Sequence, residues 1–117
     1  MARAATETQP PRERNPDMLA EFSIYPLHAE HMSRHIARVI ETLEQTGLPY
    51  HLGPMSTSVE GDWDQVMEAI RRCHQLLASD HDRVVTMITI DDRKHQPHHL
   101  AEMISSVEQQ LGRLARH

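Results

Sequence analysis

Residues 50–62 read Tyr50-His-Leu-Gly-Pro-Met-Ser-Thr-Ser-Val-Glu-Gly-Asp62, with a Gly-Pro turn between two short extended runs. These runs, residues 50–52 and 55–60, predict two strands that are adjacent in the chain. The second run carries Glu60 in a segment with little other charge. A carboxylate inside a strand must be solvated, paired with another group or used to hold a ligand. The role of Glu60 is therefore the main functional question that this sequence raises.

One strand and one helix are predicted before this hairpin. From Leu19 to Leu27 apolar and polar residues alternate, which is typical of a strand with one buried face. From His28 to Gln45 the apolar period becomes helical, and Gly47 and Pro49 favour an end to the helix there. The residues expected to face the core are Ala20, Phe22 and Ile24 in the strand and Met32, Ile36, Val39, Ile40 and Leu43 in the helix.

A helix, a strand and a last helix are predicted after the hairpin. Asp62 is a typical N-cap for the first of them, and residues 83–91 form the clearest strand of the chain. That strand is apolar on both sides, which indicates that both of its faces are covered. The apolar stripes of the two helices are Val66, Ile70, Cys73 and Leu77 in the first, and Leu100, Met103, Ile104, Val107, Leu111 and Leu114 in the second.

The order strand, helix, strand, strand, helix, strand, helix predicts an α+β fold. Its first six elements follow the split pattern of a ferredoxin-like βαββαβ antiparallel sandwich, to which a C-terminal helix is added. Such a sandwich carries two helices on one face of the sheet and leaves the other face open. Because the strand at residues 83–91 is apolar on both sides, we expect oligomerisation through the open face.

Length and composition favour one domain, residues 18–117, after a polar, proline-rich N-terminal tail at residues 1–17 that we expect to be flexible. The chain has 12 Lys and Arg against 17 Asp and Glu, a balance that argues against nucleic acid or an anionic membrane as its main partner. No apolar run is long enough to span a bilayer, and no signal peptide is recognisable. The single cysteine excludes an intrachain disulfide and fits a cytoplasmic location.

Ten histidines raise the question of a metal site. His28, His31 and His35 would share one side of the first helix, and His95, His98 and His99 precede the last one. Imidazoles grouped in this way can bind a transition metal. The alternative is that they are exposed polar residues, because no cysteine or carboxylate completes a recognised zinc spacing. A His-rich, metal-responsive oligomer is therefore one hypothesis, although the sequence implies no cofactor.

Signals for catalysis are sparse. There is no nucleophile elbow or glycine-rich phosphate loop, and Cys73 lies on a core stripe, where a thiol is a poor nucleophile. Glu60 can serve as a general acid or base only with a partner that the sequence does not identify. Arg93 can hold an anion or lie in a solvated turn. A small-molecule enzyme that uses Glu60 in the cavity of a ferredoxin-like dimer is the alternative to a binding protein.

Four segments resemble the small ferredoxin-like thiamine-binding protein family. They are Glu21-Phe-Ser-Ile-Tyr-Pro-Leu27, Tyr50 to Gly61, Arg83-Val-Val with Ile90-Asp-Asp-Arg93, and Ser106-Val107. Their order and spacing agree over residues 18–112. Two positions depart from many relatives, which carry lysine in place of Met103 and glycine in place of Ser56, so no role of that lysine carries over.

The resemblance implies a cytoplasmic homo-oligomer in which sheets pack into dimers and dimers pair into tetramers. It implies non-catalytic binding of thiamine, vitamin B1, or of its hydroxymethylpyrimidine moiety. The recurrent polar positions of the family correspond here to Ser23, Thr57, Glu60, Asp91 and Arg93. Tyr50 is also of a suitable type, because hydroxyls and carboxylates match the donors and acceptors of an aminopyrimidine. Glu60 is then expected to face a cavity shared with the first strand.

Overall fold

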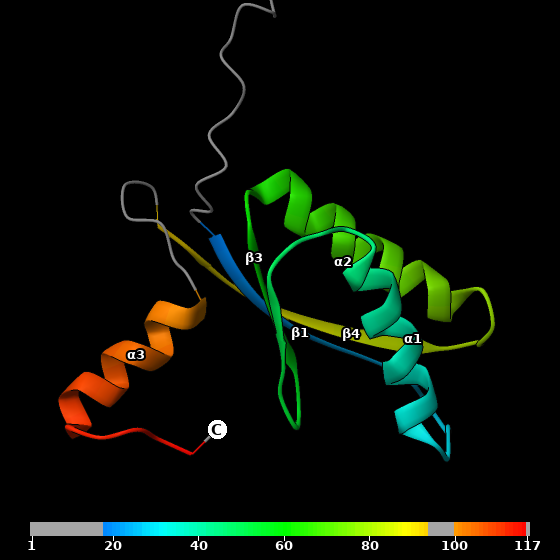
Figure 1. The fold of residues 1–117 in the computed structure, drawn as a ribbon. Coiled ribbons are helices and arrows are strands. Elements are labelled where there is room, and N and C mark those ends of the chain that lie inside the picture. Colours follow the sequence, from blue (N-terminus) through cyan, green and yellow to red (C-terminus); the bar gives the residue numbers. More distant parts are fainter. Residues whose placement is uncertain (1–17, 94–99, 117) are drawn as a thin grey trace, which may run out of the picture.

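The computed structural model describes residues 18–93 and 100–116 (Figure 1). The predicted N-terminal tail lies outside these residues, as do His95, His98 and His99. The described chain forms four strands and three helices in the predicted order. Their bounds are β1 Met18–Pro26, α1 Met32–Glu44, β2 Tyr50–Leu52, β3 Thr57–Gly61, α2 Trp63–Ala78, β4 Val84–Asp92 and α3 Leu100–Leu111.

The four strands form one antiparallel sheet in the order β2-β3-β1-β4. This is the strand order of a ferredoxin-like βαββαβ unit, so the predicted fold class is confirmed. Helices α1 and α2 lie on the same face of the sheet, and α3 stands apart from them (Figure 1). We call the other face of the sheet the open face. No helix in the described part of the chain is long and apolar enough to cross a membrane.

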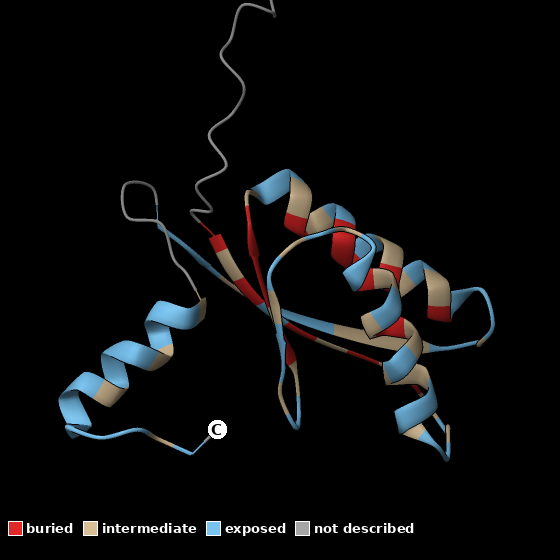
Figure 2. Ribbon diagram, in the orientation of Figure 1, coloured by how far each residue is buried: buried red, intermediate tan, exposed pale blue. Residues whose placement is uncertain are grey.

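The core lies between the sheet and the pair α1 and α2 (Figure 2). Alternate residues of β1 point into it, as predicted. Helix α2 begins with a capping box, in which Asp62 accepts from the Gln65 backbone and the Gln65 side chain accepts from the Asp62 backbone. The core residues are Met18, Ala20, Phe22 and Ile24 of β1, Val39 and Leu43 of α1, Val59 of β3, and Val66, Ala69, Ile70, Cys73 and Leu77 of α2.

Helix α1 begins later than predicted. A turn follows β1, and His28 adopts a left-handed backbone conformation with φ of 68°. The helix therefore starts at Met32, and His31 is its N-cap residue. The prediction that three histidines share one side of this helix is wrong, because only His35 belongs to it. The turn at residues 28–31 thus takes the place of the first helical turn that the sequence predicts from His28 onward.

Strand β4 is less covered than its apolar pattern predicts. It was expected to be covered on both sides, but it is the edge strand of the sheet and pairs with β1 alone among the described strands. Met87 on the open face is 61% exposed, and Ile88 on the helix face is 39% exposed. Val84 and Ile90 pack against the core, so the predicted cover is present on part of the helix face and is missing at Met87 and Ile88.

Helix α3 has an apolar stripe but little to pack against. None of its twelve residues, all within the described chain, is buried. Met103, Val107 and Leu111 are each about half exposed, and Leu114 lies beyond the helix end at Gly112. Its main contacts are with β3. The helix is therefore present as predicted, without a buried face.

Candidate functional site

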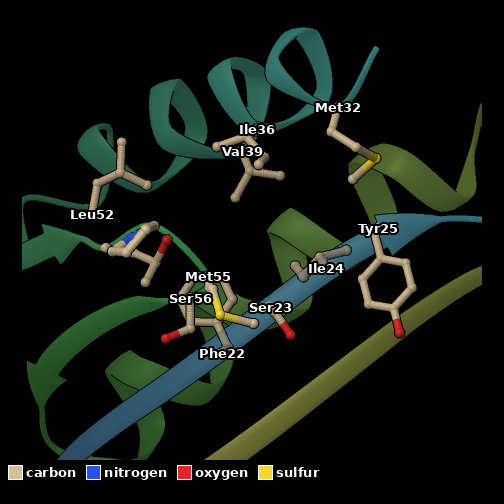
Figure 3. A pocket seen from close by; sticks show the side chains of 13 residues that line it. Phe22, Ser23, Ile24, Tyr25, Met32, Ile36, Val39, Leu52, Met55 and Ser56 are labelled. Carbon is tan, nitrogen blue, oxygen red and sulfur yellow. The ribbon is translucent and has the colours of Figure 1, made fainter. Parts of the chain in front are cut away.

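A cavity of about 130 Å³ lies between the second half of β1, the first half of α1 and the hairpin formed by β2 and β3 (Figure 3). Its apolar walls come from Phe22 and Ile24 of β1, Met32, Ile36 and Val39 of α1, and Leu52 and Met55 of the hairpin. Figure 3 shows the side chains of α1 projecting toward β1, with Ile24 pointing up to meet them and Tyr25 pointing away. Ser23, Ser56 and Thr57 supply polar atoms to the lining.

The cavity exists because β3 is shorter than β1. Strand β3 begins at Thr57, opposite Phe22, whereas β1 continues to Pro26. The hairpin closes before it reaches the rest of β1, through a hydrogen bond of 2.9 Å from the Gly53 N–H to the Ser56 carbonyl. A Cβ atom on Gly53 would lie 2.9 Å from that carbonyl oxygen, so this tight closure requires glycine. The second half of β1 is thus left with a strand partner on its β4 side only.

This arrangement turns part of the β1 backbone toward the cavity. The Leu27 N–H donates to the Arg83 carbonyl at 3.0 Å, so the backbone groups of odd-numbered β1 residues point toward β4. By alternation, the N–H and C=O of Ile24 point to the other side of β1. Strand β3 does not extend that far, because its first residue, Thr57, stands opposite Phe22. A strand edge of this kind offers a donor and an acceptor next to each other. The cavity therefore combines apolar walls with a backbone hydrogen-bonding edge.

A carboxylate stands at the rim of the cavity. Ser56, which lines the cavity, donates from its Oγ to Oε2 of Glu21 at 2.8 Å. Glu21 is exposed on the open face of β1. The hydrogen bond therefore places a solvated negative charge beside the cavity mouth, where it favours a cationic group.

Two of the six candidate residues, Ser23 and Thr57, lie together at this cavity. Thr57 is only 6% exposed and belongs to the helix face of the sheet. Ser23 occupies the next part of β1, at an open-face position opposite Met87. Tyr50 lies elsewhere, on β2, where its hydroxyl donates to Oε2 of Glu44 at 2.5 Å. That bond, followed by partial burial and the negative charge of Glu44, raises the pKa of Tyr50.

Glu60 holds the start of α3. It is 6% exposed, and its Oε2 accepts a hydrogen bond of 2.7 Å from the Leu100 backbone N–H. A carboxylate at a helix N-terminus satisfies an otherwise unpaired donor and faces the positive end of the helix dipole. The burial that was expected for Glu60 is observed. The Glu60 side chain is buried by α3, however, and it does not line the cavity beside β1.

Asp91 and Arg93 lie toward the same end of the sheet as Glu60. Leu19 of β1 stands opposite Glu60 on one side and opposite Asp91 on the other, so the three share a row on the open face. Arg93 directly follows β4 and is exposed. Ser23 is four residues further along β1, about 13 Å at the usual strand rise. Within one chain, the six candidate residues thus occupy three places.

The described histidines and the cysteine do not form a metal centre. Within residues 18–93 and 100–116, no group of three or more His, Cys, Asp or Glu side chains is arranged to hold a metal ion. His35 packs edge-on against His81, with 4.8 Å between the ring centroids. Cys73 is fully buried, and burial raises the pKa of its thiol to about 11. Cys73 is therefore a core residue, as predicted.

Sequence reasoning missed most of the cavity walls. Met32 and Ile36 were assigned to the general core stripe of α1, and Glu21 and Ser56 were not considered as site residues. Ser56 lies in the turn of the hairpin that the sequence predicts, but nothing in the sequence links it to Glu21, which is 35 residues away. The sequence also gives no signal that β3 begins only at Thr57, opposite Phe22, because strand boundaries are poorly marked in a sequence.

Residues 20–108 match the family described as "Thiamine-binding protein". A UPF0045 protein of Methanocaldococcus jannaschii is 30% identical over 91 residues, which cover 77% of this chain and 91% of that protein. A UPF0045 protein of Methanothermobacter thermautotrophicus is 31% identical over 96 residues, covering 79% and 97% respectively.

The fold has a counterpart among solved structures. The crystal structure of a hypothetical protein of Methanocaldococcus jannaschii superposes with a TM-score of 0.73 at 29% identity. The superposition covers 79% of this chain and 96% of that protein. The matched part of this chain thus corresponds to nearly the whole of a separate small protein.

Proposed function

Because the chain belongs to the thiamine-binding protein family, we propose that it binds thiamine, or the hydroxymethylpyrimidine moiety of thiamine, and releases it unchanged. We place this activity in a cytoplasmic homo-oligomer that is built as a dimer of dimers. The family supports the ligand class, and the cavity beside β1 supports the location. The single observation that carries the proposal is a ring-sized apolar cavity beside an unpaired strand edge.

The cavity volume favours one ring over two. An engineered apolar cavity of about 150 Å³ takes up benzene, so about 130 Å³ suits a single six-membered ring. We therefore assign the pyrimidine ring to the cavity. The thiazolium ring of intact thiamine would then remain at the mouth.

The polar groups of the cavity suit an aminopyrimidine. Its amino group donates hydrogen bonds and its ring nitrogens accept them. The backbone C=O and N–H of Ile24 offer the complementary pair on the strand edge, and Thr57 and Ser23 add hydroxyls that can donate or accept. A few convergent polar groups in an apolar pocket are the usual means of orienting a small ligand.

The rim suits a cation. Glu21, held by Ser56 at 2.8 Å, would stand beside the thiazolium. Because this carboxylate is exposed, its attraction is screened by water and salt, and it tunes affinity rather than creating it. Hydroxymethylpyrimidine lacks the cation, so loss of the Glu21 charge should weaken the binding of thiamine alone.

Three of the remaining four candidate residues enter the proposal through a second copy of the chain. Tyr50, Glu60, Asp91 and Arg93 lie away from the cavity in a single chain. Glu60, Asp91 and Arg93 would contact the ligand only if another copy brought its open face against this one. Tyr50 lies on the helix face, packed against the core, so an open face cannot supply it. The bond from Leu100 to Glu60 gives this carboxylate a structural partner, which supports binding over acid–base chemistry at Glu60.

Calorimetric titration of the purified protein with thiamine and with hydroxymethylpyrimidine tests the proposal. We expect saturable heat for both ligands, and loss of both in Ile36→Phe, which fills the cavity from α1. Ala37→Phe is the matched control, because Ala37 is the next residue on the same helix and is exposed outside the cavity. No heat with folded wild-type protein at millimolar ligand would overturn the proposal.

A further inference from the structure

We propose that the cavity binds unphosphorylated ligands in preference to their phosphate esters, and that Glu21, positioned by Ser56, makes this distinction. The inference rests on the proposed function and narrows its ligand class. Thiamine and hydroxymethylpyrimidine each carry a primary hydroxyl group that can be esterified with phosphate. A phosphate monoester carries nearly two negative charges at pH 7. The charged groups around the cavity mouth therefore decide how well such an ester can bind.

The described lining of the cavity contains no lysine, arginine or histidine. Its polar side chains are the phenol of Tyr25 and the hydroxyls of Ser23, Ser56 and Thr57. Phosphate sites in proteins usually supply arginine, lysine or a group of converging backbone N–H groups. Neutral hydroxyls cannot replace them, because an anion that leaves water needs a counter-charge or several strong donors. A phosphate drawn into this cavity would lose its water without gaining either.

The hairpin tip has already used donors that a phosphate would need. The Gly53 N–H donates to the Ser56 carbonyl at 2.9 Å, and Pro54 has no N–H. The Ser56 hydroxyl donates its single proton to Oε2 of Glu21 at 2.8 Å. Ser56 and Glu21 therefore offer a ligand only oxygen lone pairs. This part of the rim accepts hydrogen bonds from a ligand and repels an anion.

The arginines of α1 do not reverse the charge of the rim. Arg34 and Arg38 line a neighbouring groove that shares part of its wall with the cavity, but Glu41 and Glu44 line the same groove. Arg38 is also paired with Asp80 at 2.9 Å. The start of α1 adds about half a positive charge, which is less than the full charge on the rim carboxylate. The formal net charge of −5 adds a repulsion of anions at longer range.

These charges set the size of the expected preference. Two unit charges about 4 Å apart in bulk water change an equilibrium constant about fivefold. Glu21 is exposed, so this solvated value applies rather than that of a buried pair. A phosphate ester with nearly two charges should then bind about tenfold more weakly than the corresponding alcohol. Because salt screens exposed charges, the preference should shrink as the ionic strength is raised.

Calorimetric titration of the full chain with matched ligands tests the inference. The pairs are thiamine with thiamine monophosphate, and hydroxymethylpyrimidine with its monophosphate. In each pair the alcohol should bind about tenfold more tightly at low salt, and the ratio should fall toward one in about 1 M salt. The acetate ester of thiamine is the control for size, because it enlarges the same oxygen without adding charge. Its affinity should resemble that of thiamine rather than that of the monophosphate.

Substitutions at the rim test which residue makes the distinction. Each variant is scored by the ratio of its affinities for thiamine and thiamine monophosphate, so that a general loss of binding cancels. Glu21→Gln should bring the ratio close to one, and Glu21→Lys should reverse it in favour of the monophosphate. Ser56→Ala leaves the Glu21 charge without its partner and should give an intermediate ratio. Glu41→Gln is the matched control, because it removes an exposed carboxylate of α1 outside the cavity and should keep the wild-type ratio.

Two outcomes would overturn the inference. One is equal affinity of the wild-type chain for thiamine and its monophosphate, and the other is a wild-type ratio in Glu21→Gln. If the wild type binds both equally and Arg34→Gln loses only the monophosphate, the neighbouring groove holds the phosphate instead. Heat with every ligand but no preference within the pairs would reject this inference alone. No heat with any of them would reject the proposed function as well.

Discussion

The sequence carries apolar patterns for both faces of the sheet, but in the structure the helix face is packed much more fully than the open face. On the helix face, the stripes of α1 and α2 meet alternate residues of β1, and Phe22, Leu43 and Leu77 are at most 2% exposed. On the open face, the apolar residues of β4 and the stripe of α3 are left largely uncovered. Apolar periodicity thus identified both surfaces and gave no sign of which one a single chain can bury.

The difference lies in what each surface has to pack against. Helices α1 and α2 are tied to the sheet by short connections, so their stripes are satisfied within the chain. Helix α3 is attached to the sheet through the Glu60 carboxylate and its contacts with β3. A helix of about twelve residues is marginal in water without tertiary packing. Within residues 18–93 and 100–116, the open face and α3 therefore have less to pack against than the helix face.

The largest expected effect is a difference in the free energy of unfolding between substitutions on the two surfaces. Leu43→Ala should lower the free energy of unfolding by about 2–5 kcal/mol, because it removes a fully buried side chain and leaves a cavity. Val107→Ala, on the exposed stripe of α3, should cost under about 0.5 kcal/mol when the chain is dilute. Urea titration at submicromolar protein concentration measures both.

Protein concentration provides the control for this comparison. If α3 is covered by a second copy, the cost of Val107→Ala should increase as the concentration is raised, whereas the cost of Leu43→Ala should stay constant. Equal losses for the two variants in dilute solution would mean that α3 is packed within the single chain.

A smaller effect is expected at Glu60, which joins the sheet to α3. Glu60→Gln keeps an acceptor for the Leu100 N–H and removes the charge that faces the helix dipole. We expect a loss of about 0.5–1 kcal/mol confined to α3. Hydrogen exchange should therefore be a few-fold faster at the amides of α3 and unchanged in α1 and α2.

Glu21→Gln is the matched control for this substitution. It removes a carboxylate from the same face of the sheet, where the partner is Ser56 rather than α3. Exchange that accelerates throughout the sandwich in Glu60→Gln would show that this carboxylate stabilises the sheet itself rather than the start of α3.

The fold was predictable because its signals are local. Alternation in β1, the helical stripes, the Asp62 cap and the turn at Gly53 are each set by neighbours in sequence. The site was less predictable because it depends on where β3 begins, at Thr57, and on the direction in which the backbone groups of Ile24 point. The role of Glu60 depends on a hydrogen bond across 40 residues of sequence. The chemical type of a residue can be read from the sequence, but its hydrogen-bond partner is decided by the tertiary structure.

The smallest effect is expected at the rim of the covered region, where His35 of α1 meets His81 of the turn after α2. The His35 Nδ1 atom is buried without a hydrogen-bond partner in the described chain. Partial burial, followed by the charges of His81, Arg38 and Arg34, lowers the pKa of His35 below its ordinary value of 6.5, and Asp80 opposes this shift weakly. The folded state therefore favours the neutral imidazole.

The sign of the pH dependence follows from proton binding. Below pH 6.5 the unfolded chain binds a proton at His35 before the folded chain does, so stability is complete above that pH and falls as the pH decreases through the folded pKa. His35→Phe keeps a ring against His81 and removes the titration. Its unfolding free energy should change less between pH 7.5 and 5 than that of the wild type, as measured by urea titration. Leu43→Ala should lower stability at both pH values and keep the wild-type slope. A slope unchanged in His35→Phe would assign the acid sensitivity of the covered region to other groups.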